Sequence, residues 1–505
     1  MRGFTLCLVS FLVIFGSWFQ SVSSQNVTKS DIQQAAFPPR GWNSYDAFSW
    51  IISEEEFLQN AELVSQRLLA HGYEYVVVDY LWYRKKVPGA HSNSLGFDVI
   101  DQWGRMAPDP VRWPSSKSGN GFTEIAKKVH SLGLKFGIHI MAGISTQAVN
   151  ANTPILDTTT GAAYQESGRV WHAKDIAIQE RRCGWMTNGF MSVNTTLGAG
   201  KAFLRSLHEQ YAAWGVDLVK HDCVFGEDLD LNEITYESEV LSKVNRPLLY
   251  SLSPGVKATP DMAKQVSGLV NMYRIAGDDW DVWGDVKSHF NVSRDMAAAN
   301  LIGAKGLKGN SWPDLDMLPF GWLTDAAVND GPHRSCRLTL EEQRTQMTLW
   351  AMAKSPLMYG GDVRKIDNAT YEIITNPTLL EINHFSSNNK EFPYVTKNET
   401  RNQVKEIRSK EAPIQSVEGV SSADISSWIA TGRKGEVYLA FFNLSEQKTP
   451  IYAHRSNLSK AFTGKRIRSC KGQELWSGKY VATKKGSIST DVGVHGCALF
   501  VLNCK

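Results

Sequence analysis

Eight short apolar segments recur along the first 361 residues, and their β-branched and aromatic residues favour buried strands over helices. Segments that are apolar on both faces are typical of parallel sheets, whose two faces are both covered. The eight segments are PRGWNSY (39–45), YVVVDYLW (75–82), LKFGIHIM (134–141), VDLVKHDC (216–223), PLLYSLS (247–253), MYRIAGDD (272–279), SWPDLDML (311–318) and SPLMYGG (355–361).

Helical patterns occupy the intervals between these segments. Ser53 with Glu56, and Thr339 with Glu342, have the spacing of capping boxes, and Thr123 opens a further helix. Alternating strands and helices imply a parallel sheet with right-handed crossovers, and eight such units indicate a (β/α)8 TIM barrel. An open doubly wound sheet is the alternative, but no GxGxxG follows the first strand.

The chain divides into a long catalytic region and a shorter tail. We expect the barrel over residues 25–395, a linker or long loop over 396–423, and an antiparallel β-sandwich over 424–505, where short alternating strands recur. The long interval between the third and fourth strands predicts an excursion at about 142–200, which includes Trp171, Trp185 and Asn194. Excursions of this length usually lie at the functional face.

Composition narrows the class of protein. Among 505 residues, 42% are hydrophobic and 21% charged, which excludes a disordered or fibrous chain. A net charge of +3 does not indicate a nucleic-acid binder, and only the N-terminus carries a long apolar run. The sequence does not predict an oligomeric state.

The N-terminus predicts the secretory pathway. Arg2, an apolar stretch and small residues up to Ser24 are typical of a signal peptide over residues 1–24, and a membrane anchor is the alternative. We therefore expect a secreted glycoprotein without membrane attachment after cleavage, in the extracellular space, the cell wall or an acidic vacuole-like compartment. N-x-S/T acceptors occur at Asn26, Asn194, Asn291, Asn368, Asn398, Asn443 and Asn457.

Six cysteines remain once Cys7 leaves with the signal peptide, which permits disulfides without fixing their partners. No CxxC or HExxH pattern predicts a metal site.

Carboxylates follow the predicted strands, and in a parallel barrel that end faces the active site. Carboxylates accept hydrogen bonds from sugar hydroxyls, and nearby aromatic rings suit the C–H face of a sugar. Some of these residues have the alternative role of helix N-caps. The acidic residues are Asp79, Asp222, Asp278, Asp279, Asp314, Asp316 and Asp362, and the aromatic ones are Trp42, Tyr80, Trp82, Tyr273, Trp280 and Trp312.

Lys220 and Asp222 lie two residues apart on the fourth strand, so both side chains point to the same face. A neighbouring ammonium favours an ionised carboxylate, as a nucleophile requires. A structural ion pair is the alternative.

A series of motifs follows over about residues 38–390. They are GWNSY (41–45), VVVDYLW (76–82), GLKFGIH (133–139), WGVDLVKHDC (214–223), YRIAGDDWDVW (273–283), WPDLDML (312–318), WAMAKSPLMYGGD (350–362) and LLEIN (379–383). In these motifs and in their order, the chain resembles glycoside hydrolase family 27, the α-galactosidase or melibiase family.

The resemblance implies a barrel with a β-sandwich, and an exo-glycosidase that retains configuration through a covalent glycosyl-enzyme. It implies Asp222 as the nucleophile and Asp278 as the acid and base, with Asp279 as the rival for the latter role. It also implies that Lys220 and Arg274 bind hydroxyls or tune the carboxyls. Trp42, Asp79 and Asp316 would line the sugar subsite, the substrate would be a carbohydrate, and no cofactor or metal would be needed.

Three departures from the family pattern concern the sugar pocket. Asp79-Tyr80 replaces two adjacent Asp residues, so one carboxylate is replaced by a bulky ring. Gln147 occupies the expected place of a family cysteine, which leaves Cys223 without that partner. The SLSPG segment (251–255) lacks the acidic-Trp pair of plant-type members.

The resemblance therefore predicts release of terminal α-D-galactose, with β-L-arabinopyranosidase activity as the close alternative. L-Arabinopyranose shares the ring configuration of galactose and lacks its CH₂OH at C5, the group that Tyr80 would exclude. An inactive glycan-binding protein and a transglycosylase are further alternatives.

Overall fold

The computed structural model describes residues 33–325, 331–393, 395–397, 424–462, 467–484 and 486–505. The predicted signal peptide over residues 1–24 and most of the predicted linker lie outside these ranges. No helix in the described ranges has the length and apolar character needed to cross a membrane.

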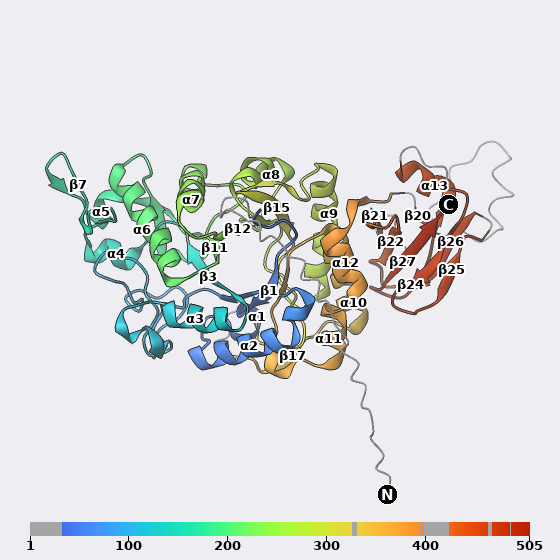
Figure 1. Cartoon of the computed structure of the whole chain (residues 1–505), viewed down its shortest axis with the longest axis horizontal. Helices are drawn as coiled ribbons and strands as arrows, with labels where there is room; N and C mark the ends of the chain where they lie inside the picture. Colours follow the sequence, from blue (N-terminus) through green and yellow to red (C-terminus); the bar gives the residue numbers. More distant parts are fainter. Residues whose placement is uncertain (1–32, 326–330, 394, 398–423, 463–466, 485) are drawn as a thin grey trace, which may run out of the picture. The chain divides into compact units, whose positions relative to one another are not determined.

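Within the described residues, all eight predicted strands are present in one parallel barrel (Figure 1). Neighbouring strands pair in parallel around the sheet, and the bridge between Leu318 and Tyr359 connects the segment after β15 to β18. The barrel strands are β1 (Arg40–Asn43), β2 (Tyr75–Val78), β3 (Lys135–Met141), β11 (Leu218–Asp222), β12 (Leu249–Leu252), β13 (Met272–Arg274), β15 (Gly309–Asp314) and β18 (Leu357–Tyr359).

Gly41 shows why a small residue is needed between the first two strands. A Cβ atom at Gly41 would lie 2.4 Å from the carbonyl oxygen of Tyr75, which is closer than real contacts allow. A larger residue there would push β1 away from β2.

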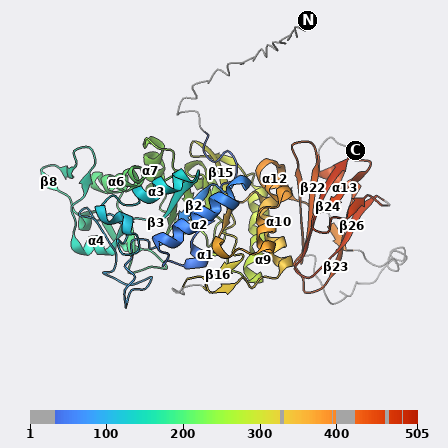
Figure 2. The same cartoon turned by 60° about the horizontal axis from the view of Figure 1, so that its bottom comes forward.

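Helices cover the outside of the barrel, and α2 and α3 pack against β2 and β3 (Figure 2). The capping boxes at Ser53 and Thr339 are confirmed, because each hydroxyl accepts the amide of the Glu three residues later. The helices of the barrel region are α1 (Tyr45–Phe48), α2 (Glu54–Arg67), α3 (Thr123–Ser131), α6 (Gly198–Trp214), α7 (Leu231–Lys243), α8 (Pro260–Val266), α9 (Trp283–Ala298), α10 (Leu340–Ala353), α11 (Asn368–Ile374) and α12 (Pro377–Phe385).

The predicted excursion after β3 contains short strands and two short helices. Its elements are β4 (Ile144–Ser145), α4 (Thr146–Ala151), β5 (Leu156–Asp157), β6 (Ala162–Ala163), β7 (Gln165–Glu166), β8 (Arg169–Val170), α5 (Ala173–Ile176), β9 (Ala177–Arg182) and β10 (Phe190–Val193). Short strands described elsewhere in the barrel region are β14 (Ala304–Gly306), β16 (Trp322–Leu323) and β17 (Arg334–Ser335).

The described residues of the C-terminal region form two antiparallel sheets. Their described order is β19-β21-β22-β27-β24-β25 and β20-β23-β26. The first sheet begins with β19, from a segment that the sequence analysis assigned to the barrel. The elements are β19 (Ser387–Glu391), β20 (Val395–Lys397), β21 (Ile425–Thr431), β22 (Val437–Asn443), β23 (Thr449–His454), α13 (Arg455–Ala461), β24 (Cys470–Glu474), β25 (Tyr480–Ala482), β26 (Ser487–Val492) and β27 (Cys497–Cys504).

The larger C-terminal sheet is apolar on both faces. Ile429, Leu439 and Phe500 belong to the core of the C-terminal region. Phe442, which points to the other face, packs edge-on against Phe290 of α9 with ring centroids 5.0 Å apart. Because both faces of this sheet are buried, the sequence of β22 is an almost continuous run of apolar residues.

Candidate active site

The carboxyl ends of β2, β3 and β11 bring the predicted residues Asp79, Lys220 and Asp222 together with His139. The ammonium of Lys220 lies 2.8 Å from Asp79 Oδ2, and His139 Nε2 lies 3.0 Å from Asp222 Oδ2. Lys220 and Asp222 are thus on the inner face of β11, as their spacing predicts. These contacts place the three strand ends around one polar site.

Asp79 is a buried anion with three hydrogen-bond donors around it. It accepts hydrogen bonds from Lys220, from Asn43 Nδ2 at 2.8 Å and from the amide of Tyr80 at 2.9 Å. Burial opposes ionisation of Asp79, but Lys220 and His139 outweigh it and lower the pKa of the carboxyl. Burial also opposes the charge of Lys220, yet Asp79 and Asp316 raise its pKa above the ordinary value. Both groups are therefore charged near neutral pH.

Asp222 has the features of a nucleophile. Its side chain is 24% exposed, so a substrate can reach it. Burial acts to raise its pKa, but the hydrogen bond and charge of His139 and the amide of Cys223 lower it overall. The carboxylate is consequently ionised and oriented before substrate binds.

Arg274, at the end of β13, contacts two acidic residues. Its guanidinium lies 3.1 Å from Asp278 Oδ1 and 3.3 Å from Asp316 Oδ2. Asp278 is 58% exposed, whereas Asp316 is buried and has a left-handed backbone with a φ of 80°. Lys220 of β11, Arg274 of β13 and Asp316, which follows β15, also line one cavity of about 20 Å³.

Asp279, the rival for the acid role, is buried away from solvent. Gln346 of α10 donates a hydrogen bond to its carboxylate, and its own amide donates to Asp316 at 2.9 Å. Burial, followed by the charge of Asp316, raises the pKa of Asp279 well above its ordinary value. The contacts of Asp279 therefore position Asp316 and α10. Of the two adjacent residues Asp278 and Asp279, only Asp278 is exposed.

Two further strand-end carboxylates have structural contacts. Asp314 is buried and accepts the amide of Asp316 at 2.9 Å. Burial and the charge of Asp316 raise the pKa of Asp314 to about 7. Asp362 caps the short 3₁₀ turn Val363–Lys365 and binds the guanidinium of Arg364. Asp362 therefore has the role of a helix N-cap, the alternative to sugar binding.

The prediction that Trp42 lines the subsite is wrong. Trp42 is fully buried, donates from Nε1 to the carbonyl of Gly361 at 2.8 Å, and packs against Phe57 of α2. Side chains alternate along a strand, so Trp42 faces the helices while its neighbour Asn43 faces inward. Trp82, Tyr273 and Trp312 are likewise buried core residues.

Tyr45 is the aromatic residue that the sequence analysis missed. Its ring centroid lies 5.4 Å from that of Tyr80 and 5.6 Å from that of Trp280, and Lys220 Nζ lies 5.9 Å from the ring. His139 was also missed as a site residue, because a histidine inside an apolar strand has no distinctive sequence signal.

Tyr80 fills one corner of the site. Its hydroxyl lies 3.1 Å from Ser49 Oγ, and its ring contacts Tyr45, His139 and Trp185 with centroid distances of 5.4–6.1 Å. Burial raises the pKa of Tyr80 to about 12, so the phenol stays neutral. A neutral ring therefore occupies the space where the family pattern has a second carboxylate.

A disulfide connects the excursion after β3 to the end of β11, close to the site. Cys183 pairs with Cys223, directly after Asp222, and Trp185 is 39% exposed beside Tyr80. Gln147 instead hydrogen-bonds the backbone of Asp98, so no family-type bridge forms there. Cys223 thus has a different partner from the one that the family pattern implies. A second disulfide joins Cys470 and Cys504 in the C-terminal region.

Comparisons with known proteins match both regions of the chain. The family model "Alpha galactosidase A" matches residues 202–385, and the model for the α-galactosidase C-terminal β-sandwich domain matches 422–502. An α-galactosidase from Cyamopsis tetragonoloba is 24% identical, covering 92% of this chain and 86% of the relative. The α-galactosidase mel1 of Schizosaccharomyces pombe is 28% identical over 74% of this chain and 73% of its own length.

A solved structure provides a nearer relative. The family 27 β-L-arabinopyranosidase from Geobacillus stearothermophilus is 32% identical, with a TM-score of 0.77, and the match covers 93% of this chain and 97% of that chain. Identity at this level over nearly the whole of both proteins confirms the predicted fold, the carbohydrate substrate and a glycosidase of the α-galactosidase type. The chain belongs to glycoside hydrolase family 27.

Proposed function

We propose that this enzyme is a retaining exo-glycosidase that cleaves β-L-arabinopyranosides faster than α-D-galactosides. The observation that carries the preference is the buried Tyr80 ring, which contacts Tyr45 and Trp185 where a second carboxylate would accept a sugar hydroxyl. Both substrates share the ring configuration, so one catalytic apparatus serves both.

In the proposed mechanism, Asp222 attacks the anomeric carbon while Asp278 protonates the departing glycosidic oxygen. Asp278 then removes a proton from water, which attacks the same carbon and displaces Asp222. Two inversions retain the configuration. The lowered pKa of Asp222 and the exposure of Asp278 support this assignment.

The surrounding charged groups fit the binding of sugar hydroxyls. Asp79 and Asp316 are acceptors held in place by Lys220 and Arg274. Because these ion pairs exist before substrate binds, little reorganisation is needed when the hydroxyls replace water. Trp185 is 39% exposed and its ring centroid lies 5.7 Å from that of Tyr80, which supports a contact between Trp185 and the aglycone.

Relatives support both activities. The Geobacillus enzyme is named a β-L-arabinopyranosidase, and one of its variants was solved with arabinose. The Cyamopsis and Schizosaccharomyces relatives are named α-galactosidases. We therefore retain α-galactosidase activity as the second candidate, favoured by these sequence relatives.

The proposal includes entry into the secretory pathway and glycosylation. Asn291 and Asn368 are exposed and accessible to glycans. Asn443 is not a suitable acceptor, because it is buried and its amide donates to the carbonyls of Gln447, Val492 and Gly493. We therefore assign Asn443 a structural role in the C-terminal region.

A paired assay tests the function. We expect kcat/KM on nitrophenyl β-L-arabinopyranoside to exceed that on nitrophenyl α-D-galactopyranoside, and Asp222→Asn to abolish both activities. Equal or reversed preference would contradict the specificity argument. Sugar binding without hydrolysis by the unmodified enzyme would identify a glycan-binding protein, and predominant transfer to added sugar would identify a transglycosylase.

A further inference from the structure

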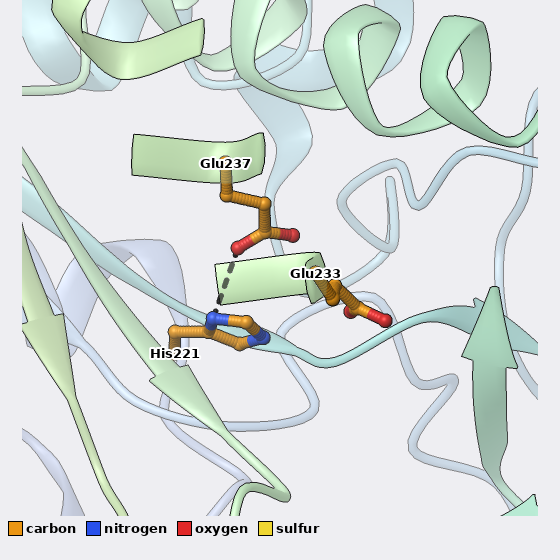
Figure 3. A group of neighbouring side chains, drawn as sticks. All are labelled: His221, Glu233 and Glu237. Carbon is orange, nitrogen blue, oxygen red and sulfur yellow. Dashed lines mark ion pairs between the residues drawn. The ribbon is translucent and has the colours of Figure 1, made fainter. Parts of the chain in front are cut away.

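The outer face of β11 carries a second polar cluster, separate from the sugar site. His221 lies between Lys220 and Asp222 in sequence and therefore points away from the sugar site, toward α7. His221, Glu233 and Glu237 are all buried, and one potential ligand atom from each lies within 4.8 Å of the others (Figure 3). The mechanism proposed above uses none of these three residues.

Glu237 orients the imidazole of His221. Nδ1 of His221 lies 2.9 Å from Glu237 Oε2 and 2.7 Å from the hydroxyl of Tyr250, which itself donates to Glu237 at 3.0 Å. The carboxylate accepts the Nδ1 proton and leaves the lone pair of Nε2 available. A carboxylate that holds the distal N–H of an imidazole is the usual support of a metal-bound histidine.

Two buried atoms of the cluster have no hydrogen-bond partner among the described residues. They are His221 Nε2 and Glu233 Oε2, and in Figure 3 the Nε2 side of the ring is turned toward Glu233. The other oxygen of Glu233 is fixed, because it accepts the amide of Gly143 at 2.6 Å. Unsatisfied buried polar atoms are costly, so this pair has the character of a ligand site.

Space and charge favour a cation. A cavity of about 40 Å³ is lined by His221 and Glu233 and extends to Arg181, Asp228 and Asp230, which is enough room for an ion with a water molecule. The two carboxyl groups and the imidazole offer ligand atoms within 4.8 Å of one another, and all three side chains are buried. A cation between them would compensate for the burial of two acidic side chains.

We infer a binding site for one divalent transition-metal ion of the Zn²⁺ class, with His221 Nε2 and Glu233 Oε2 as ligands and Glu237 as their support. An imidazole donor favours Zn²⁺ over Mg²⁺ and Ca²⁺, which prefer oxygen ligands. Water molecules that enter through the cavity would complete the coordination of the ion. The ion ties β11 to α7 and to the turn at Gly143, so its role is structural.

Sequence patterns did not reveal this site, because its ligands come from a strand and a helix without a CxxC or HExxH signature. Glu233 and Glu237 are four residues apart and share one face of α7. The missing information was the outward direction of His221, which only the fold supplies.

The test uses the full-length enzyme, stripped with EDTA and titrated with Zn²⁺ alone. We expect one Zn²⁺ per chain by calorimetry and elemental analysis, and a rise in melting temperature of about 2 °C or more at saturation. Mg²⁺ and Ca²⁺ at the same concentration are expected to leave the melting temperature unchanged. Absence of stoichiometric Zn²⁺ binding would overturn the inference.

Matched variants locate the ion. Glu233→Gln retains an oxygen for Gly143 and removes the charged ligand, so we expect at least a tenfold loss of Zn²⁺ affinity. Glu239→Gln, at an exposed position on the same helix, should bind as the unmodified enzyme does. Equal affinity in both variants would contradict the assignment. Zinc X-ray absorption on the unmodified enzyme needs no variant and should show one imidazole; none or several would also contradict it.

Discussion

Lys220 Nζ lies 2.8 Å from Asp79 Oδ2, and this ion pair connects the second and fourth strands of the barrel. Lys220 is therefore engaged mainly with Asp79, while His139 is the hydrogen-bond partner of Asp222, the proposed nucleophile. The resemblance implies that Lys220 and Arg274 bind sugar hydroxyls or tune the carboxyls, and the structure adds His139 as the main cause that, against burial, lowers the pKa of Asp222.

We predict that Lys220→Met destabilises the enzyme by about 3–5 kcal/mol, because it leaves Asp79 buried without its counter-ion. Chemical denaturation at pH 7 measures this loss. The double variant Lys220→Met/Asp79→Asn should recover part of it, since the buried charge is then removed. Additive losses in the double variant would show that the two residues do not interact.

The same pair predicts a dependence of stability on pH. The folded-state pKa of Asp79 is lowered, so its contribution is complete above the unfolded pKa of about 3.9 and is lost as pH falls through the folded pKa. The enzyme should therefore lose stability in the range below about pH 4. Asp79→Asn should reduce that slope, which denaturation at successive pH values will measure.

His139→Leu tests the tuning of the nucleophile. Without the hydrogen bond from His139, burial dominates and the pKa of Asp222 rises. We expect the acid limb of the kcat/KM profile to move to higher pH, with kcat lower by about 10–100-fold. An unchanged acid limb with reduced kcat would mean that His139 only supports packing.

Tyr80→Asp tests the specificity argument. A carboxylate at this corner restores an acceptor for the hydroxyl on the CH₂OH group and removes the ring. We predict a shift of at least about tenfold in the ratio of kcat/KM values toward the α-D-galactoside. Tyr80→Phe is the matched control and should keep the preference of the unmodified enzyme, because its ring still fills the corner. A ratio unaffected by Tyr80→Asp would show that the corner does not select the sugar.

Expression in a secretory host tests the acceptor sites. We predict glycans at Asn291 and Asn368, which are exposed, and none at Asn443, whose amide has three carbonyl partners. Peptide mapping before and after glycosidase treatment measures occupancy. A glycan on Asn443 would require that strand β22 be open during synthesis.

Much of the barrel could be predicted from the sequence, because buried parallel strands leave continuous apolar runs and capping boxes mark helix starts. The carboxylates at strand ends were visible for the same reason, since their position follows from the fold class. Trp42 could not be assigned correctly, because only the register of β1 shows that Trp42 points outward and Asn43 inward.

Long-range contacts were beyond sequence reasoning. The partner of Cys223 is Cys183, which lies 40 residues away within an excursion of irregular structure. The exposure that distinguishes Asp278 from Asp279 also depends on packing, because Gln346 reaches Asp279 from α10. In each case the deciding neighbour is remote in the chain and carries no motif.

The most direct test of the central claim is trapping of the glycosyl-enzyme. Asp278→Ala, mixed with dinitrophenyl β-L-arabinopyranoside, still forms the intermediate because this leaving group needs no acid, but hydrolyses it slowly. Mass spectrometry of the quenched protein should show one added arabinosyl residue, located on the peptide that contains Asp222. Absence of an adduct during turnover, or a label on another carboxylate, would contradict the double-displacement mechanism proposed for Asp222 and Asp278.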